Sequence, residues 1–208
     1  MNLQKEYWNK IYESISAKKP KYDLWLDKYE NILVNSKDTP IIDLGCGFGN
    51  DTLYLKERNY EVVSCDFSEQ ALNRLNKIID NLDTRCFDLR DGLPFEASCA
   101  KIVIADLSLH YFTWDETKKI LNEISRVLMF NGVLLCRVNS VKDTNYGVGQ
   151  GIRIEENFYN IDGNLKRFFN KAQLRELFEN WSIEYMKEVQ ISRYKMNKVA
   201  WEISIKKT

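Results

Sequence analysis

The sequence has a single histidine, His110, and none of its five cysteines belongs to a C-x-x-C pair. A zinc site needs clustered cysteine and histidine ligands, so we expect no metal site. Basic and acidic residues number 30 each, which leaves no net charge to attract nucleic acid. No apolar run approaches the length of a membrane span, and the N-terminal residues carry charge. These absences predict a cytoplasmic protein without nucleic-acid or membrane partners, and they leave monomer and homodimer open.

A linker rich in proline, glycine or serine is also missing, so we expect one domain across residues 1–208. Helical patterns include one with Ser68 as its N-cap and one with a capping box at Thr113 and Glu116, which we expect Asn131-Gly132 to end. Between the helical patterns lie short β-branched runs typical of buried strands, at 39–45, 60–67, 84–89, 101–107 and 132–138. This alternation predicts an α/β fold, a doubly wound Rossmann-like and mostly parallel sheet with helices on both faces.

The last third of the chain departs from this alternation. Residues 139–169 contain several glycines and no clear period, so we expect either a lid or substrate insert, or a partly disordered loop. Asn170 and Gln173 then open another helix. Runs 181–189 and 199–207 alternate apolar and polar residues, which suits an antiparallel pair at the end of the sheet.

The strongest local pattern is a buried strand that runs into three alternating glycines, Gly45, Gly47 and Gly49. Glycine permits a tight strand-to-helix turn and lets a ligand lie against the backbone. Asp66 ends the next strand about 20 residues further on, where a carboxylate can accept both hydroxyls of a ribose. The pattern therefore predicts a nucleoside site.

Acidic residues around the turn indicate what kind of nucleoside this site binds. A dinucleotide fingerprint has the spacing G-x-G-x-x-G, but here Gly49 comes one residue early. Asp43 precedes the turn, where it would repel a pyrophosphate and suit an ammonium group. Asp88 and Asp106 end the third and fourth strands at the edge where open α/β sheets bind ligands. We therefore expect a cationic ligand without phosphate.

The segment Asp43-Leu-Gly-Cys-Gly-Phe-Gly49 resembles the first motif of the class I S-adenosylmethionine-dependent methyltransferases, and more narrowly of their small-molecule, tellurite-resistance-like branch. Asp88-Leu89 and the segments 106–111 and 126–134 are similar to later motifs, although the family often has Pro-Gly where Phe130-Asn131 stands. The resemblance implies a seven-stranded sheet with an antiparallel last strand, and a helical cover formed by residues 1–30. The cofactor would be S-adenosylmethionine and the product S-adenosylhomocysteine. The resemblance implies these cofactor-binding residues: Asp43, Gly45, Cys46, Gly47, Gly49, Asp66, Phe67, Asp88, Leu89, Asp106, Leu107, Ser108, Trp8 and Tyr12.

Methyl transfer is an in-line displacement that needs alignment and exclusion of water. His110 is the candidate base, because it lies just past Asp106 and its ordinary pKa is near neutrality, although it could equally pack or form a hydrogen bond there. Candidate substrate contacts are Tyr111, Tyr146, Arg153, Arg193 and Tyr194. We predict methyl transfer to a small-molecule acceptor. The sequence leaves open a catalytically silent cofactor-binding module, an enzyme that methylates protein or nucleic acid, and a nicotinamide-dependent oxidoreductase.

Overall fold

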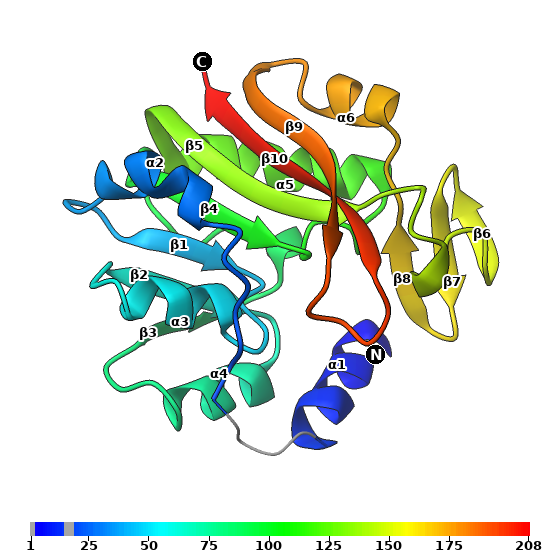
Figure 1. The fold of residues 1–208 in the computed structure, drawn as a ribbon, viewed down its shortest axis with the longest axis horizontal. Helices are drawn as coiled ribbons and strands as arrows, with labels where there is room; N and C mark the ends of the chain where they lie inside the picture. The colour runs from blue at the N-terminus through cyan, green and yellow to red at the C-terminus, as the bar shows by residue number, and fades with distance from the viewer. Residues whose placement is uncertain (1–2, 15–18) are drawn as a thin grey trace.

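The computed structural model describes residues 3–14 and 19–208, and its main layer is a seven-stranded sheet (Figure 1). The strand order is β3-β2-β1-β4-β5-β10-β9, in which β10 runs antiparallel to both of its neighbours. The predicted fold class is confirmed, and each predicted run overlaps one of these strands. Their bounds are Asp83–Cys86 (β3), Val62–Asp66 (β2), Ile41–Leu44 (β1), Ala100–Asp106 (β4), Leu128–Asn139 (β5), Lys198–Lys207 (β10) and Trp181–Ile191 (β9).

Helices cover both faces of the sheet, because successive side chains of a strand point to opposite faces. Ile41 of β1 joins a buried cluster with α2 and α3, whereas its neighbour Ile42 joins a second cluster with α5 and α6. α4 packs beside α3. The helices are α1 (Leu3–Ser14), α2 (Glu30–Val34), α3 (Asn50–Lys56), α4 (Glu69–Asn76), α5 (Trp114–Val127) and α6 (Lys171–Leu177), with short 3-10 helices at Asp27–Tyr29, Leu89–Asp91 and Thr144–Tyr146.

The predicted helix starts are confirmed by their caps. The Ser68 hydroxyl accepts a hydrogen bond from a backbone N–H in the first turn of α4. Thr113 with Glu116 forms a complete capping box at α5, and Asn170 with Gln173 forms another at α6. Each cap satisfies N–H groups that have no partner within their helix.

The predicted end of α5 at Asn131-Gly132 is wrong. The helix ends at Val127, and Leu128 already has extended backbone angles, φ −67° and ψ 138°. Asn131, with φ 61°, and Gly132 lie inside β5, where the pairing with β4 shifts register. The pair therefore forms an irregularity within a strand, which is the other common use of a residue with positive φ.

Residues 139–169 are ordered, so the expectation of a partly disordered loop is wrong. They contain an antiparallel sheet of three strands, β6 (Ile152–Glu155), β7 (Phe158–Ile161) and β8 (Asn164–Arg167). Asp162 and Gly163 form the turn between β7 and β8, with φ values of 52° and 86°. An Asp-Gly pair with positive φ at both residues is typical of a two-residue hairpin turn.

α1 lies beside α4 and β8, on the side of the molecule toward which β1, β2 and β4 point (Figure 1). The side-chain carbonyl of Asn9 accepts a hydrogen bond of 2.6 Å from the hydroxyl of Ser68 at the start of α4. No helix in the described part of the chain is long and apolar enough to cross a membrane. The cytoplasmic location stays a prediction.

Candidate active site

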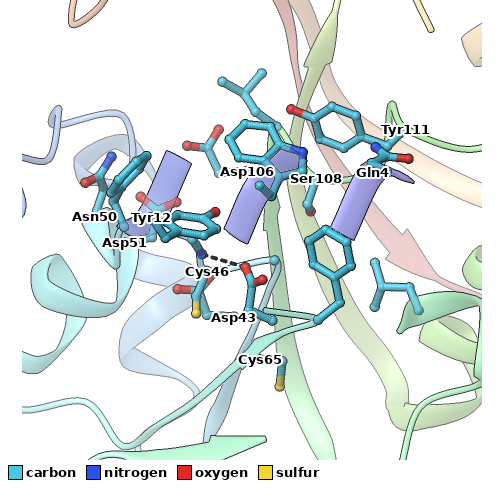
Figure 2. Close-up of a pocket in the computed structure, with 18 of the residues that line it drawn as sticks. Gln4, Tyr12, Asp43, Cys46, Asn50, Asp51, Cys65, Asp106, Ser108 and Tyr111 are labelled. Atoms are coloured by element: carbon cyan, nitrogen blue, oxygen red, sulfur yellow. Dashed lines mark hydrogen bonds between the residues drawn. The ribbon is translucent and has the colours of Figure 1, made fainter. Parts of the chain in front are cut away.

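A cavity of about 550 Å³ lies at the carboxyl ends of β1, β2 and β4. Small-molecule sites in proteins commonly have volumes of about 300–1,000 Å³. Figure 2 shows Asp43, Cys46 and Asp106 near its centre, with Asp51 toward one end and Tyr111 toward the other. The acids that the sequence predicts at this edge all line the cavity, namely Asp43, Asp66, Asp88 and Asp106.

The glycine turn after β1 forms the floor of the cavity. Gly45 has φ 71°, and a Cβ added there would lie 2.4 Å from the Cβ of Ser108, so only glycine fits beneath the segment that follows β4. The backbone N–H of Gly47 donates a hydrogen bond of 2.9 Å to Oδ2 of Asp66. The bare backbone of the turn and the acid of β2 are thus held together as one site.

Asp66 and Asp43 are the acids nearest to this floor. Asp66 also accepts a hydrogen bond of 2.9 Å from the N–H of Ser68. Burial raises the pKa of Asp66 to about 6, although the hydrogen bonds from Ser68 and Gly47 lower it. Asp43 accepts a hydrogen bond of 2.7 Å from the hydroxyl of Thr52. Burial, with added repulsion from Asp106 and Asp66, raises the pKa of Asp43 to about 7. A cationic ligand would favour the ionised form of both carboxyl groups.

Asp106 also lines the cavity, but its oxygens are already engaged. Oδ1 accepts a hydrogen bond of 2.6 Å from Arg137, and Oδ2 accepts one of 2.8 Å from Arg137 and one of 2.7 Å from Arg193. Burial would raise the pKa of Asp106, but the charges of Arg137 and Arg193 outweigh it and hold the pKa well below its usual range. The side chain of Asp106 therefore holds two arginines in place, and its oxygens are not free to bind a ligand.

The part of the cavity wall that follows β2 and β3 is mostly apolar. Phe67, Phe87 and Leu89 line it, next to Asp88. Both carboxylate oxygens of Asp88 accept hydrogen bonds from the Arg90 guanidinium, at 3.0 and 2.6 Å. These bonds lower the pKa of Asp88 although burial opposes the shift. An aromatic ring system fits between such side chains.

An aromatic cluster closes the cavity on the side of α1. The rings of Trp8 and Tyr12 stack with centroids 5.9 Å apart, as their spacing of four residues predicts. Trp8 meets Tyr111 edge-on at 5.7 Å, and Tyr12 meets Phe48 at 5.0 Å. These contacts join α1 to the glycine turn and to the segment after β4.

Three predicted site residues lie outside the cavity wall. Gly49 begins α3 with φ 79°, and a Cβ there would lie 2.2 Å from Leu75 of α4, so this glycine serves helix packing. The Tyr146 hydroxyl accepts a hydrogen bond of 3.2 Å from the backbone N–H of Met196, and its ring meets that of Tyr194 with centroids 5.6 Å apart. Arg153 is exposed on β6. None of these three residues lines the cavity, and their roles in binding stay predictions.

His110, the predicted base, also lies outside the cavity wall. Its side chain packs behind Tyr111, with ring centroids 4.3 Å apart, and the residue is only 2% exposed. Burial, and then the charges of Lys198 and Lys166, hold the pKa of His110 well below its usual value. The ring therefore contacts Tyr111, which lines the cavity, without lining the cavity itself, and the catalytic role of His110 stays a prediction.

The other predicted residues lie on the wall, and several further residues were missed. Asp51 is the most notable, because it is 4% exposed, burial raises its pKa well above the usual value, and it accepts a hydrogen bond of 2.8 Å from the Trp25 indole. Its only signal in the sequence is its place just after the glycine turn, where a helix usually meets solvent. The remaining missed residues are Gln4, Lys21, Tyr22, Phe48, Asn50, Cys65, Phe87 and Arg90.

Such a sheet, with a glycine turn after β1 and an acid at the end of β2, has the architecture of the class I S-adenosylmethionine-dependent methyltransferases. Residues 41–132 match the sequence model of the family described as "Methyltransferase domain", so this part of the chain is a methyltransferase domain. The match confirms the predicted methyltransferase family for these residues, and it agrees with the predicted class of enzyme and with the predicted cofactor, S-adenosylmethionine.

Solved structures show the same fold. A S-adenosylmethionine-dependent methyltransferase from Methanosarcina mazei superposes with a TM-score of 0.75 at 19% identity, covering 89% of this chain and 98% of that one. The 1,6-didemethyltoxoflavin-N1-methyltransferase of Burkholderia thailandensis, solved with S-adenosylhomocysteine, gives 0.65 at 18% identity, covering 99% and 84%.

Curated relatives are more similar in sequence but longer. The chain is 25% identical over 201 residues to the tRNA N(3)-cytidine methyltransferase METTL2B of Homo sapiens, which covers 90% of this chain and 52% of that protein. It is 29% identical over 134 residues to the putative methyltransferase YqeM of Bacillus subtilis, covering 62% and 53%. The chain thus spans about half the length of the curated relatives it matches.

Proposed function

We propose that this chain transfers a methyl group from S-adenosylmethionine to a small-molecule acceptor. The observation that carries the proposal is the joining of the bare backbone of Gly45 and Gly47 to the carboxylate of Asp66 on one cavity floor. The cavity fits the cofactor in three respects. Its volume is adequate, one end is apolar, and Asp43 and Asp66 carry raised pKa values that a cationic ligand would reverse.

Each part of the wall has a defined task in this proposal. Asp66 accepts the ribose hydroxyls, and Phe67 and Leu89 enclose the adenine. Asp43 supplies the negative charge for the ammonium group, acting from beneath the glycine turn. The proposal assigns no general base to His110, because its ring does not reach the cavity.

S-adenosylmethionine, when bound, supplies a methyl group on a positively charged sulfur. The chain's own contribution is to hold the acceptor in line with that methyl group and to keep water out. Trp8, Tyr12 and Tyr111 form the cover that does so. Effective alignment of two reactants accounts for a large share of the rate enhancement in such displacements.

A second candidate acceptor is a cytidine base in tRNA, which the names of METTL2 relatives favour. Two observations support the small molecule instead. The sequence has no net charge, and α1 covers the cavity with aromatic side chains, which restricts the acceptor that can enter. Both candidates use the same cofactor site.

Titration calorimetry with S-adenosylmethionine, S-adenosylhomocysteine and NAD tests the cofactor. We expect binding of the first two and none of NAD. Methyl-labelled cofactor is then incubated with the protein and either a cell metabolite extract or unmodified tRNA, and we expect label in a small molecule. Label in tRNA alone would replace the proposed acceptor with the second candidate. Binding without any labelled product would contradict the proposed activity and identify a silent binding module.

A further inference from the structure

Arg167, the last residue of β8, is a buried cation. The residue is 1% exposed, and its guanidinium carbon lies 4.6 Å from the ring centroid of Phe158 and 5.6 Å from that of Trp114. Its Nη2 donates a hydrogen bond to Oε2 of Glu155, and its Nη1 donates one of 3.3 Å to the carbonyl of Glu156. The charge is therefore enclosed between the three-stranded sheet and the start of α5.

Two further hydrogen bonds of Arg167 reach the segment that follows β4. The backbone N–H of Arg167 donates one of 2.7 Å to the carbonyl of His110, and its Nε donates one of 3.1 Å to the carbonyl of Phe112. Residues 107–113 form neither helix nor strand, so no ladder of backbone hydrogen bonds holds them. Among the described residues, no other hydrogen bond reaches the backbone of residues 109–112. Arg167 is thus the polar anchor of this segment.

The anchored segment forms part of the cavity wall. Tyr111 lies between the two carbonyls that Arg167 holds, and both Tyr111 and Phe112 line the cavity, with Tyr111 toward one end (Figure 2). No described residue between 113 and 192 lines it, so the three-stranded sheet has no wall residue of its own. The sheet therefore acts on the cavity through the wall residues that Arg167 holds.

A guanidinium suits this task better than it suits simple packing. A buried charge is costly to desolvate, and an apolar side chain of similar volume often packs as well or better. The rigid fork of arginine donates in several fixed directions, here to one carboxylate and two carbonyls. Oε2 of Glu155 also accepts a hydrogen bond of 3.0 Å from the N–H of Trp114. The end of β6 is thus tied to the same segment a second time.

We propose that Arg167 is a positioning residue that sets the fit of the methyl acceptor, because it holds Tyr111 and Phe112 in the cavity wall. The inference rests on the proposed function and deepens it, since it gives residues 139–169 a part in acceptor specificity. Methyl transfer needs the acceptor in line with the methyl group, and a displacement of about 1 Å can lower the rate by about a hundredfold. The glycine turn and Asp66 lie on other elements, so cofactor binding should be spared.

The rate of methyl transfer and the binding of S-adenosylhomocysteine in Arg167→Met test the inference. The full chain receives methyl-labelled cofactor and the pool that the wild type labels, either a metabolite extract or tRNA. Initial rates are divided by the number of S-adenosylhomocysteine sites that calorimetry counts. We expect an affinity within about twofold of the wild type and a rate per site about tenfold to a hundredfold lower. Arg175→Met, at an exposed arginine of α6, is the matched control and should change neither value.

Glu155→Gln gives a second measurement if the loss of a buried charge prevents Arg167→Met from folding. The Glu155 side chain is 33% exposed, and glutamine keeps an acceptor oxygen while losing the charge. The hold on Arg167 weakens, so the rate per site should fall about threefold to tenfold. A merely structural role would lower the number of sites and leave the rate per site unchanged.

Tyr111→Ala shows whether Arg167 acts through the wall. If it does, Arg167→Met should lower the rate less in the Tyr111→Ala background than in the wild type, because part of what Arg167 positions is already missing. Two residues that act independently would instead lower the rate by the product of their separate effects.

The inference is overturned if the folded variants at Arg167 and Glu155 transfer label at the wild-type rate per site. It is also overturned if the affinity for S-adenosylhomocysteine falls as far as the rate, or if Arg167→Met and Tyr111→Ala act independently. A wild-type protein that labels neither pool would refute the proposed function itself, so the two failures are distinguishable.

Discussion

The ends of β2 and β4 carry the same kind of residue in opposite circumstances. Asp66 is 6% exposed and the Asp106 side chain 7% exposed. Asp66 accepts backbone N–H groups, and burial raises its pKa to about 6, whereas two arginines hold the pKa of Asp106 well below its usual range. A carboxylate that accepts only backbone N–H groups has a pKa that a bound cation can still lower. A carboxylate that is already paired with two guanidinium groups is not available to a ligand. The end of β2 is therefore the proposed binding site, whereas the acid at the end of β4 holds Arg137 and Arg193 in place.

The largest expected difference between the two acids is in stability. Asp106→Asn removes the carboxylate that Arg137 and Arg193 share and leaves Asp23 as the acid paired with both, and we expect the free energy of unfolding to fall by about 3–5 kcal/mol. Asp66→Asn should cost less than about 1 kcal/mol, because ionising this acid already opposes folding near neutral pH. Urea unfolding of both variants measures the contrast, and equal losses would contradict it.

The ranking reverses for cofactor binding. Asp66→Asn should weaken S-adenosylhomocysteine by about a hundredfold, because the charged acceptor of two ribose hydroxyls is lost. Calorimetry gives the affinity directly. Asp83→Asn, at the amino end of β3 and away from the cavity, is the control and should bind normally. Undiminished affinity in Asp66→Asn would place the ribose elsewhere.

The pH dependence sharpens the contrast further. Below their pKa values of about 7 and about 6, Asp43 and Asp66 are neutral and must lose protons to face a cation. The affinity for the cofactor should therefore rise with pH through this range, by at most about tenfold per pH unit for each proton released. Calorimetry in buffers of different ionisation enthalpy counts the protons. Asp43→Asn should remove the rise in affinity near pH 7. An affinity of the wild type that stays constant with pH would contradict the roles of Asp43 and Asp66 in binding the cation.

Stability of the ligand-free protein should follow the opposite trend. The pKa of Asp43 is raised from 3.8 to about 7 on folding, so its contribution is fully present below about pH 3.8 and is lost as the pH rises through about 7. Asp106 has a lowered pKa, so its contribution is present above about pH 3.8 and is lost only in acid. Urea midpoints measured across pH in wild type and Asp43→Asn separate the two, and identical profiles would remove Asp43 from the account.

The smallest effect is expected at His110, which packs behind the wall rather than on it. His110→Gln should keep the rate of label transfer within about twofold of the wild type, since the ring does not line the cavity. Initial rates measured well below the unfolding temperature exclude a loss of folded protein. A tenfold slower rate would return this histidine to the catalytic residues.

The sequence predicts the strands and the acid of β2 well, because these features depend on local pattern. A buried strand, a glycine turn and a strand-ending acid appear in order along the chain, and the parallel topology brings them together. The Asp162-Gly163 hairpin also carried a local signal that was overlooked among short, half-buried strands.

The ion pairs of Arg137 with Asp106 and Asp23 had no local signal in the sequence. Arg137 lies inside an otherwise apolar strand, and its partner Asp23 is 114 residues away in the chain. Nothing in the order of residues says that they pair, nor that Tyr111 rather than His110 faces the cavity. Long-range pairing and the direction of a side chain in a loop both depend on packing between distant elements, which periodicity does not report.

The pairing of Arg137 with Asp23 and of Arg193 with Asp106 also orders events in time. Gly47 and Asp66 are 19 residues apart, whereas 87 residues separate Asp106 from Arg193. Contacts of such separation form slowly, because a long loop must close first. The floor of the cavity therefore forms from a short stretch of chain, whereas the wall beside Asp106 is complete only after the β9–β10 turn has packed against β4.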